Sequence, residues 1–165
     1  MSFYDEHNFN YAKGLRQWLW KRRLKGFITN KGSFLDLGCG CGHIIELFKS
    51  PDIKLSGCDL SLRSLNIAKE LSPNINFFWH DIDTEEIKER YNLILSIGVL
   101  HHTRKGVSNL IKYKADKYVI GLYHKGIYSF LYKFFKGKDW FKHTFWQDCF
   151  ITPCVSIYNE KNIPK

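Results

Sequence analysis

Short apolar runs alternate with amphipathic segments through the middle of the chain. Five of the runs have the length and the residue types of buried strands: GSFLDLG, IKLSGCDLS, INFFWHDID, YNLILSIGVL and KYVIGLY. The segments HIIELFKS, LRSLNIAKELS and TEEIKER between them are predicted to be helices, with Ser61 as the N-cap of the second. Strands that alternate with helices at this spacing predict βαβ units and a mostly parallel α/β sheet covered on both faces.

An N-terminal segment precedes this core. Residues 10–25 carry apolar side chains at helical spacing between basic residues. Trp18 and Leu24 lie on the expected apolar face and need an apolar partner. We therefore predict an N-terminal helical extension over residues 1–29.

The core is placed at residues 30–125, and the chain changes character after it. Residues 126–165 interleave aromatic residues with lysines. Such a basic aromatic segment could complete a small core or stack on nucleic acid bases. We expect it to pack on or over the core and to roof the strand ends together with the N-terminal helix.

The composition is that of one globular domain, since 44% of the 165 residues are hydrophobic and 25% are charged. No run approaches the ~20 apolar residues that span a bilayer, and the first residues do not read as a secretory signal. Five cysteines, an odd number, favour a reducing compartment over a disulfide framework. We expect a cytoplasmic protein without a membrane span.

The net charge of +9 is unevenly distributed. Residues 1–31 carry a net charge of +5, residues 32–103 carry −4 and residues 104–165 carry +8. Basic flanks around an acidic middle fit an anionic partner, such as nucleic acid or an anionic substrate, and fit solvated helix faces equally well.

The stretch FLDLGCGCGHI allows two interpretations. Cys39, Cys41 and His43 supply three soft metal ligands, but a closed zinc site needs four and no second pair is suitably spaced. The alternating glycines fit a strand-to-helix turn in which the backbone comes close to a ligand, with the N-terminus of a helix pointing at it. The second interpretation predicts a cofactor site.

Polar residues follow the predicted strands at their carboxyl ends, where ligands bind to open α/β sheets. They are Asp36, Asp59, Asp81 and Ser96. Asp59 is placed to accept hydrogen bonds from two ribose hydroxyls. A nicotinamide fingerprint would share this acid, but its third glycine would fall at His43, and Asp36 suits an ammonium group better than a pyrophosphate.

FLDLGCGCG, LSGCDLS, INFFWHDID and YNLILSIGVLHH, in this order, resemble the successive motifs of class I S-adenosylmethionine-dependent methyltransferases over residues 30–125. The resemblance implies a Rossmann-like, doubly wound sheet. It also implies S-adenosylmethionine as cofactor and methyl transfer to an acceptor that no motif identifies. The alternative is a non-catalytic module of this fold that binds RNA or a protein partner.

The resemblance implies roles for the first motifs. Gly38, Gly40 and Gly42 would line the methionine and ribose parts of the cofactor. Asp36 would orient the loop or reach the ammonium group, directly or through water. Asp59 would hold the ribose hydroxyls.

The later motifs would hold the other end of the cofactor and its sulfur. Leu60 would pack on adenine, and Asp81 would accept from the adenine amino group with Ile82 beside it. Ser96 and the Ile97 backbone would flank the sulfonium. Asp59 and Asp81 could instead be helix caps, Asp83 could substitute for Asp81, and Ser96 could simply end a strand.

Two features leave catalysis unassigned. His101 and His102 could serve as acid or base, but members of this family use such a pair mainly for structure, so no catalytic residue is named. Full-length members also end in an antiparallel hairpin, and the residues left after the fifth strand are too few for a helix and that hairpin. We therefore expect an exposed fifth-strand edge, open to oligomer formation or to cover by the basic tail.

Overall fold

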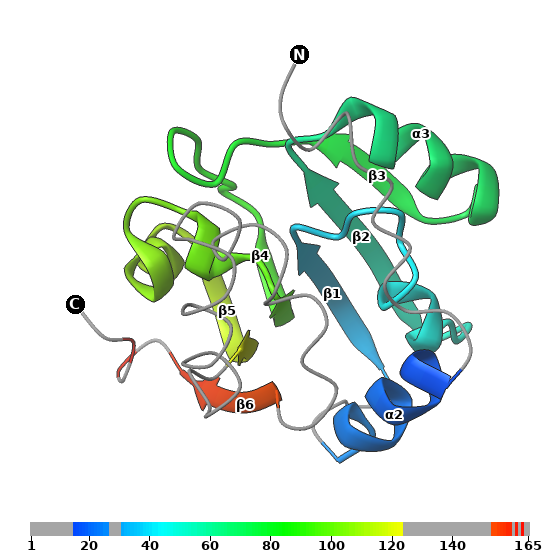
Figure 1. Cartoon of the computed structure of the whole chain (residues 1–165), viewed down its shortest axis with the longest axis horizontal. Coiled ribbons are helices and arrows are strands. Elements are labelled where there is room, and N and C mark those ends of the chain that lie inside the picture. The colour runs from blue at the N-terminus through cyan, green and yellow to red at the C-terminus, as the bar shows by residue number, and fades with distance from the viewer. Residues whose placement is uncertain (1–14, 27–30, 124–152, 160, 162, 164–165) are drawn as a thin grey trace, which may run out of the picture.

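The computed structural model describes residues 15–26, 31–123, 153–159, 161 and 163 (Figure 1). In these ranges, helix α2 spans Leu15–Leu24 and helix α3 spans Leu62–Leu71. Three 3₁₀ helices are η1 (Ile45–Phe48), η2 (Leu100–His102) and η3 (Gly106–Lys112). The strands are β1 (Gly32–Leu37), β2 (Ile53–Asp59), β3 (Asn76–Trp79), β4 (Arg90–Ile97), β5 (Lys114–Tyr123) and β6 (Pro153–Tyr158).

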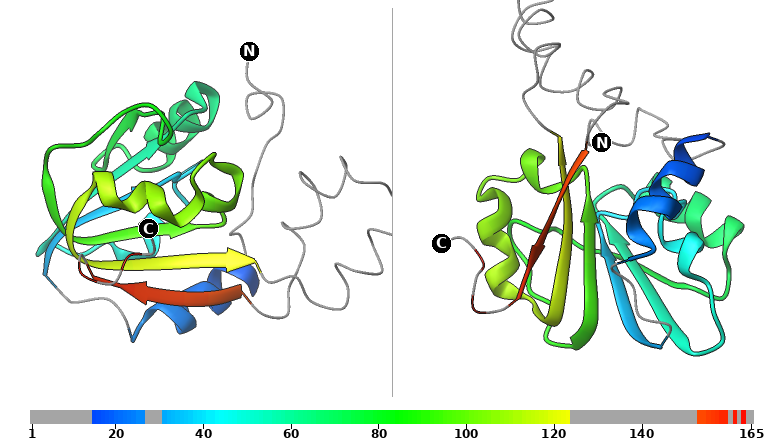
Figure 2. Two further views of the ribbon diagram at one scale, coloured as in Figure 1. Left: turned by 90° about the vertical axis from the view of Figure 1, so that its left-hand side faces the viewer. Right: turned by 90° about the horizontal axis from the view of Figure 1, so that it is seen from below.

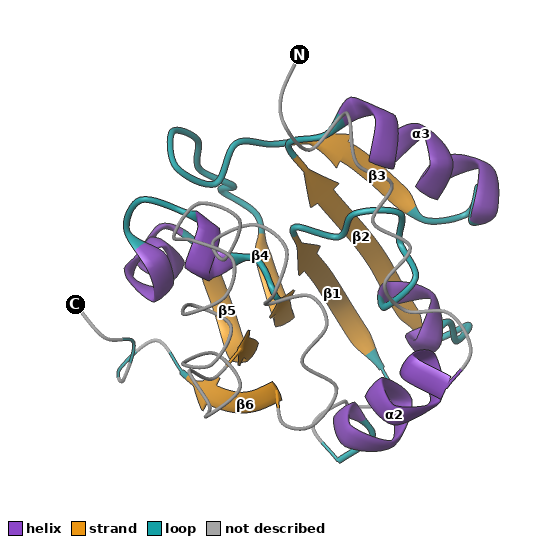
Figure 3. Ribbon diagram, in the orientation of Figure 1, coloured by secondary structure: helices purple, strands orange, loops and turns teal. Residues whose placement is uncertain are grey.

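The six strands form one sheet in the order β3-β2-β1-β4-β5-β6 (Figures 1 and 3). Strands β1 to β5 are parallel to one another, and β6 runs antiparallel to β5. The strand order reverses between β1 and β4, which pair directly, Phe34 with Leu93. This is the switch point at which open α/β sheets bind ligands, and the predicted mostly parallel sheet is confirmed.

Helical elements cover both faces of the sheet (Figure 2). On one face α2, η1 and α3 pack over a cluster that includes Phe34, Leu65 and Leu95, and on the other η2 and η3 cover a cluster that includes Leu35 and Ile94. Neighbouring strand residues enter opposite clusters because side chains alternate along a strand. Two buried faces explain why these strands read as nearly continuous apolar runs.

Ser61 caps α3 as predicted, since its hydroxyl accepts the backbone N–H of Ser64 at 3.2 Å. Helix α2 buries Leu24 as expected but not Trp18. Trp20 and Leu24, four residues apart, are buried, whereas Trp18 is 53% exposed and lies under the Arg22 guanidinium at 5.5 Å. The prediction that Trp18 packs against an apolar partner is therefore wrong for the described residues.

Of the two outcomes expected for the fifth-strand edge, the structure has the cover by the C-terminal tail, because β6 pairs along β5 from Tyr118↔Tyr158 to Tyr123↔Pro153. A single strand of the tail, without a two-stranded hairpin, is enough to pair this edge. Residues 126–152 lie outside the described part of the chain, as does the predicted roof that they would form.

Two predicted helices are absent from the described core. HIIELFKS forms only the four-residue η1, and TEEIKER forms no helix. In the latter segment Glu85 turns its carboxylate back to accept the Asp81 N–H at 3.0 Å. Side chains that compete for backbone groups in this way disfavour a regular helix. No helix in the described ranges is long and apolar enough to cross a bilayer.

Candidate functional site

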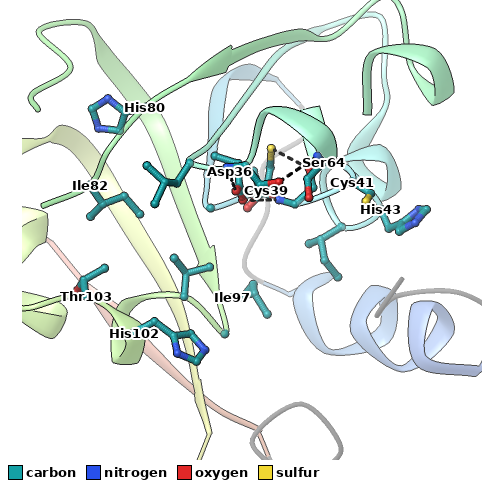
Figure 4. A pocket seen from close by; sticks show the side chains of 18 of the residues that line it. Asp36, Cys39, Cys41, His43, Ser64, His80, Ile82, Ile97, His102 and Thr103 are labelled. Atoms are coloured by element: carbon teal, nitrogen blue, oxygen red, sulfur yellow. Dashed lines mark hydrogen bonds between the residues drawn. The ribbon is translucent and has the colours of Figure 1, made fainter. Parts of the chain in front are cut away.

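A cavity of about 220 Å³ opens at the carboxyl ends of β1, β2 and β4 (Figure 4). Eight of the ten residues predicted for the cofactor line it: Asp36, Gly38, Gly40, Asp59, Leu60, Asp81, Ile82 and Ile97. The other two, Gly42 and Ser96, do not.

The loop after β1 is folded by its glycines, all three of which have positive φ angles. A Cβ atom on Gly38 would lie 2.4 Å from the Val99 side chain, and one on Gly42 would lie 2.9 Å from Phe77. These two glycines are required by packing and backbone conformation. A Cβ on Gly40 would meet nothing within 4 Å, so this residue leaves open space at the cavity wall.

Asp59, at the end of β2, ties this loop to the next one. Its Oδ2 atom accepts the backbone N–H of Gly40 at 2.8 Å, and its Oδ1 atom accepts that of Ser61 at 2.9 Å. A carboxylate offers about four acceptor positions, which is more than these two N–H groups use. The fixed carboxylate at the cavity wall suits a pair of neighbouring hydroxyl groups.

Asp36 is the most deeply buried acid of the cavity, at 2% exposed, and its Oδ2 atom has no hydrogen-bond partner. Burial, and then the nearby Asp59 carboxylate, raises the pKa of Asp36 to about 7. A buried carboxylate with an unmet acceptor is costly unless a donor or a cation reaches it. The position therefore favours a positively charged group in the cavity.

This environment predicts that Asp36→Asn stabilises the ligand-free protein at alkaline pH. Because the folded-state pKa of Asp36 lies above its unfolded value of 3.8, the wild type loses stability relative to the variant as pH rises from about 4 to about 7. Above that range the difference should level off, on the order of 1–4 kcal/mol. Urea denaturation of both proteins at acidic and alkaline pH measures it; a constant difference would contradict the prediction.

The turn after β3 adds Asp81 and Ile82 to the cavity wall, beside the residues that follow β1 and β2. Burial acts to raise the pKa of Asp81, but hydrogen bonds from Asp83 and Thr84 and the neighbouring His80 outweigh it, so the net pKa is lowered. Asp83 instead holds the segment after β4, through the Arg104 N–H at 3.0 Å and the Asn109 amide at 3.1 Å. These internal contacts favour Asp81 over Asp83 as the ligand-binding acid.

Ser96 lies behind the cavity wall. Its side chain is fully buried, and its hydroxyl donates to the Leu37 carbonyl at 3.0 Å, which joins β4 to β1. The wall itself is formed by Ile97, Gly98 and Val99. This contact fits the alternative interpretation of Ser96 as a structural residue near the end of β4.

Further residues line the cavity that were not predicted. Trp20 reaches it from α2 and packs beside Ile97 at Gly121, where a Cβ would lie 3.3 Å from the indole and 2.9 Å from Ile97. Pattern analysis of α2 offers no signal for this long-range contact. The others come from the segments that follow the same strands. They include Cys39, Ile44, Ser64, His80, Val99 and Thr103.

The cysteines of the glycine loop are buried thiols. Cys39, Cys41 and the β2 residue Cys58 carry no disulfide, and burial raises the pKa of Cys39 well above its usual value. Within the described ranges no group of three or more His, Cys, Asp or Glu side chains is arranged to hold a metal ion.

Residues 35–115 match the model of a family described as a methyltransferase domain. A protein of Invertebrate iridescent virus 6 assigned as methyltransferase 235L is 29% identical in an alignment of 105 positions that covers 56% of this chain and 38% of that protein. The tRNA U34 carboxymethyltransferase of Pseudoalteromonas translucida is 27% identical over 106 residues, 60% of this chain and 33% of the relative. The chain thus matches little more than a third of the length of these curated relatives.

The fold has solved counterparts. A TehB-like S-adenosylmethionine-dependent methyltransferase from Corynebacterium glutamicum superimposes with a TM-score of 0.59 at 22% identity, covering 77% of this chain and 80% of the other. Its likeness concerns the fold. Residues 35–115 thus match the methyltransferase domain family, and the described residues have the class I, Rossmann-like methyltransferase fold.

Proposed function

We propose that the chain binds S-adenosylmethionine at the carboxyl ends of β1, β2 and β3 and transfers its methyl group to an acceptor. The observation that carries this proposal is the open space at Gly40, bounded by the carboxylates of Asp36 and Asp59. The chain matches only about a third of the length of its curated relatives, and the methyl acceptor is left open.

The donor groups of the cofactor match the acceptors of the cavity. Its ammonium group fits the unpartnered, buried oxygen of Asp36, and its ribose hydroxyls fit the Asp59 carboxylate held at Gly40 and Ser61. Its adenine amino group fits Asp81, with Ile82 and Leu60 as apolar neighbours. Each contact is a charge-assisted hydrogen bond or a burial of apolar surface.

The residues of the chain act by binding and alignment. When bound, S-adenosylmethionine supplies a methyl group activated by the positive sulfonium. Asp36 and Asp59 would fix the cofactor in one orientation, and the apolar side chains of Trp20, Ile97 and Val99 would keep water from that part of the cavity. Alignment alone contributes much of the acceleration of a displacement. His102 lies on the same side of the cavity as Ile97 and Thr103 (Figure 4) but has no assigned catalytic role.

The cavity itself gives no support to an anionic acceptor. None of the described residues that line it is Lys or Arg, whereas four are Asp. The basic charge that favours nucleic acid lies in the flanking segments, so RNA binding by a non-catalytic module remains the alternative to test. Cys39 and Cys58 are buried thiols that form no disulfide with another described residue, which supports a cytoplasmic location.

Calorimetry with S-adenosylhomocysteine tests the assignment. The product keeps the ammonium group, and an ammonium beside Asp36 favours the ionised carboxyl and lowers its pKa. At pH 7, where the carboxyl is about half protonated, binding should release roughly half a proton. Titrations in two buffers of different ionisation enthalpy measure this release.

Two controls separate the parts of this proposal. Asp36→Asn should bind the product more weakly and release no proton from this site. 5′-Methylthioadenosine, which lacks the amino acid moiety, should bind both proteins with equal affinity. No binding of S-adenosylhomocysteine by the wild type would refute the proposed function. Equal proton release by both proteins would refute only the role of Asp36.

A further inference from the structure

His80 is a buried imidazole at the cavity, directly after β3. It is 4% exposed and bonds to other side chains through both ring nitrogens. Nε2 lies 2.8 Å from the Tyr113 hydroxyl, and Nδ1 lies 3.2 Å from Oε2 of Glu85. The ring also meets Tyr113 edge to face, with centroids 5.7 Å apart. These contacts join the end of β3 to the residue that precedes β5.

The hydrogen bonds determine where the protons lie. An ionised Glu85 can only accept, so Nδ1 carries the imidazole hydrogen and Nε2 accepts the Tyr113 hydroxyl. The same Glu85 oxygen also accepts the Asp81 backbone N–H at 3.0 Å. One carboxylate oxygen thus holds both the imidazole and the first residue of the adenine-side turn.

Hydrogen bonds within the turn and a hydrogen-bonding side chain from η3 both stabilise it. The Asp81 carbonyl accepts the N–H groups of Thr84 at 3.3 Å and Glu85 at 2.9 Å. From outside, the Lys112 ammonium donates to the carbonyls of Ile82 at 2.9 Å and Asp83 at 2.8 Å. Lys112 therefore holds the turn directly, and its neighbour Tyr113 acts on it through His80.

We infer that Glu85, His80 and Tyr113 form a positioning unit that holds the Asp81–Glu85 turn against the nucleoside part of the cofactor. The inference rests on the proposed function, because that function places adenine beside Asp81 and Ile82. None of the three residues is assigned to the reacting atoms. Loss of the unit should weaken binding of the nucleoside, whatever is attached to its 5′ carbon.

The unit also makes nucleoside binding sensitive to acid. Burial is the largest influence on His80 and lowers its pKa, with Lys112 acting in the same direction and the Glu85 and Asp81 carboxylates opposing them. The imidazole is therefore neutral at pH 7. As the pH falls through this lowered pKa, protonation places a second N–H against the Tyr113 hydroxyl, which must turn its own hydrogen away.

Binding of adenosine and of S-adenosylhomocysteine to the full chain tests the unit. Glu85→Ala and Tyr113→Phe should each weaken both ligands by the same factor, about 3- to 20-fold, as expected for lost hydrogen bonds at a partly solvated site. Glu86→Ala, at the exposed neighbouring acid, is the matched control for the first. Tyr91→Phe is the control for the second, since the buried Tyr91 bonds to Glu89 away from the cavity. Both controls should leave affinity unchanged.

The pH profile separates positioning from general stability. Adenosine lacks the ammonium group, but the titration of Asp36 near pH 7 changes the charge beside Asp59, so the profile is measured in the Asp36→Asn background. There we expect adenosine affinity to be constant from about pH 8 to 6.5 and to fall at lower pH, as His80 becomes protonated. Glu85→Gln keeps an acceptor but removes the charge that favours imidazolium, so the fall should move to lower pH.

The possible failures can be told apart. If the wild type binds neither ligand, the proposed function fails. If it binds both but Glu85→Gln leaves the pH profile unmoved, or if the variants weaken only S-adenosylhomocysteine, the positioning unit is wrong. Glu85→Gln, the conservative change, keeps the test decisive should Glu85→Ala or Tyr113→Phe fail to fold.

Discussion

Asp59→Ala is expected to weaken S-adenosylhomocysteine binding by about 2–4 kcal/mol, or roughly 30- to 1,000-fold. The proposed contacts with two ribose hydroxyls are lost, and each hydrogen bond to a carboxylate is typically worth about 1.5–3 kcal/mol before relaxation. The Gly40 and Ser61 N–H groups also lose their acceptor, so the loop that bounds the cavity is less firmly held.

Isothermal calorimetry measures this loss, and Asp52→Ala is the matched control. Asp52 is an exposed acid just before β2, at the opposite end of the strand from the cavity. Its removal should leave affinity unchanged. Asp59→Asn, which keeps one acceptor oxygen, should fall between the wild type and Asp59→Ala. Equal affinity of the wild type and Asp59→Ala would overturn the ribose assignment.

Gly38→Ala and Gly40→Ala should separate folding from binding. At Gly38 the new methyl group would lie 2.4 Å from Val99, on a residue with φ of +82°. The left-handed conformation costs about 1–2 kcal/mol for Ala, and overpacking adds about 1–3 kcal/mol. We therefore expect Gly38→Ala to lower the free energy of unfolding by about 2–5 kcal/mol.

Gly40→Ala carries only the conformational part of that cost, since nothing lies within 4 Å of its Cβ position. Its methyl group would instead enter the open space proposed for the cofactor and reduce affinity for S-adenosylhomocysteine. Urea denaturation and calorimetry on both variants give the comparison. A Gly40→Ala protein that binds as well as the wild type would show that the cofactor does not approach this glycine.

The strands could be predicted from the sequence because both faces of the sheet are buried, so YNLILSI contains an uninterrupted apolar run from Leu93 to Leu95. Asp36, Asp59 and Asp81 could be placed because parallel strands bring their carboxyl ends to one edge. These inferences depend on local pattern and on a general rule of α/β topology. No contact between distant residues has to be known for either.

The differences between the predicted residues and the residues that line the cavity depend on tertiary contacts. Ser96 follows the strand-end rule, yet its side chain turns toward Leu37 inside the sheet. Gly42 belongs to the glycine pattern but serves packing against Phe77. Trp20 enters the cavity only because Gly121, on a distant strand, leaves room for it. Periodicity does not contain this information.

The segment that follows β3 braces the sheet across its switch point. Strand β3 lies at one edge and β5 lies on the far side of β1 and β4, yet Ile82 and Asp83 are fastened to Lys112 at the end of η3. The two halves of the domain are thus mechanically linked at the wall assigned to adenine. Any movement of η3 relative to this turn would therefore have to break the two Lys112 hydrogen bonds or carry the turn with it.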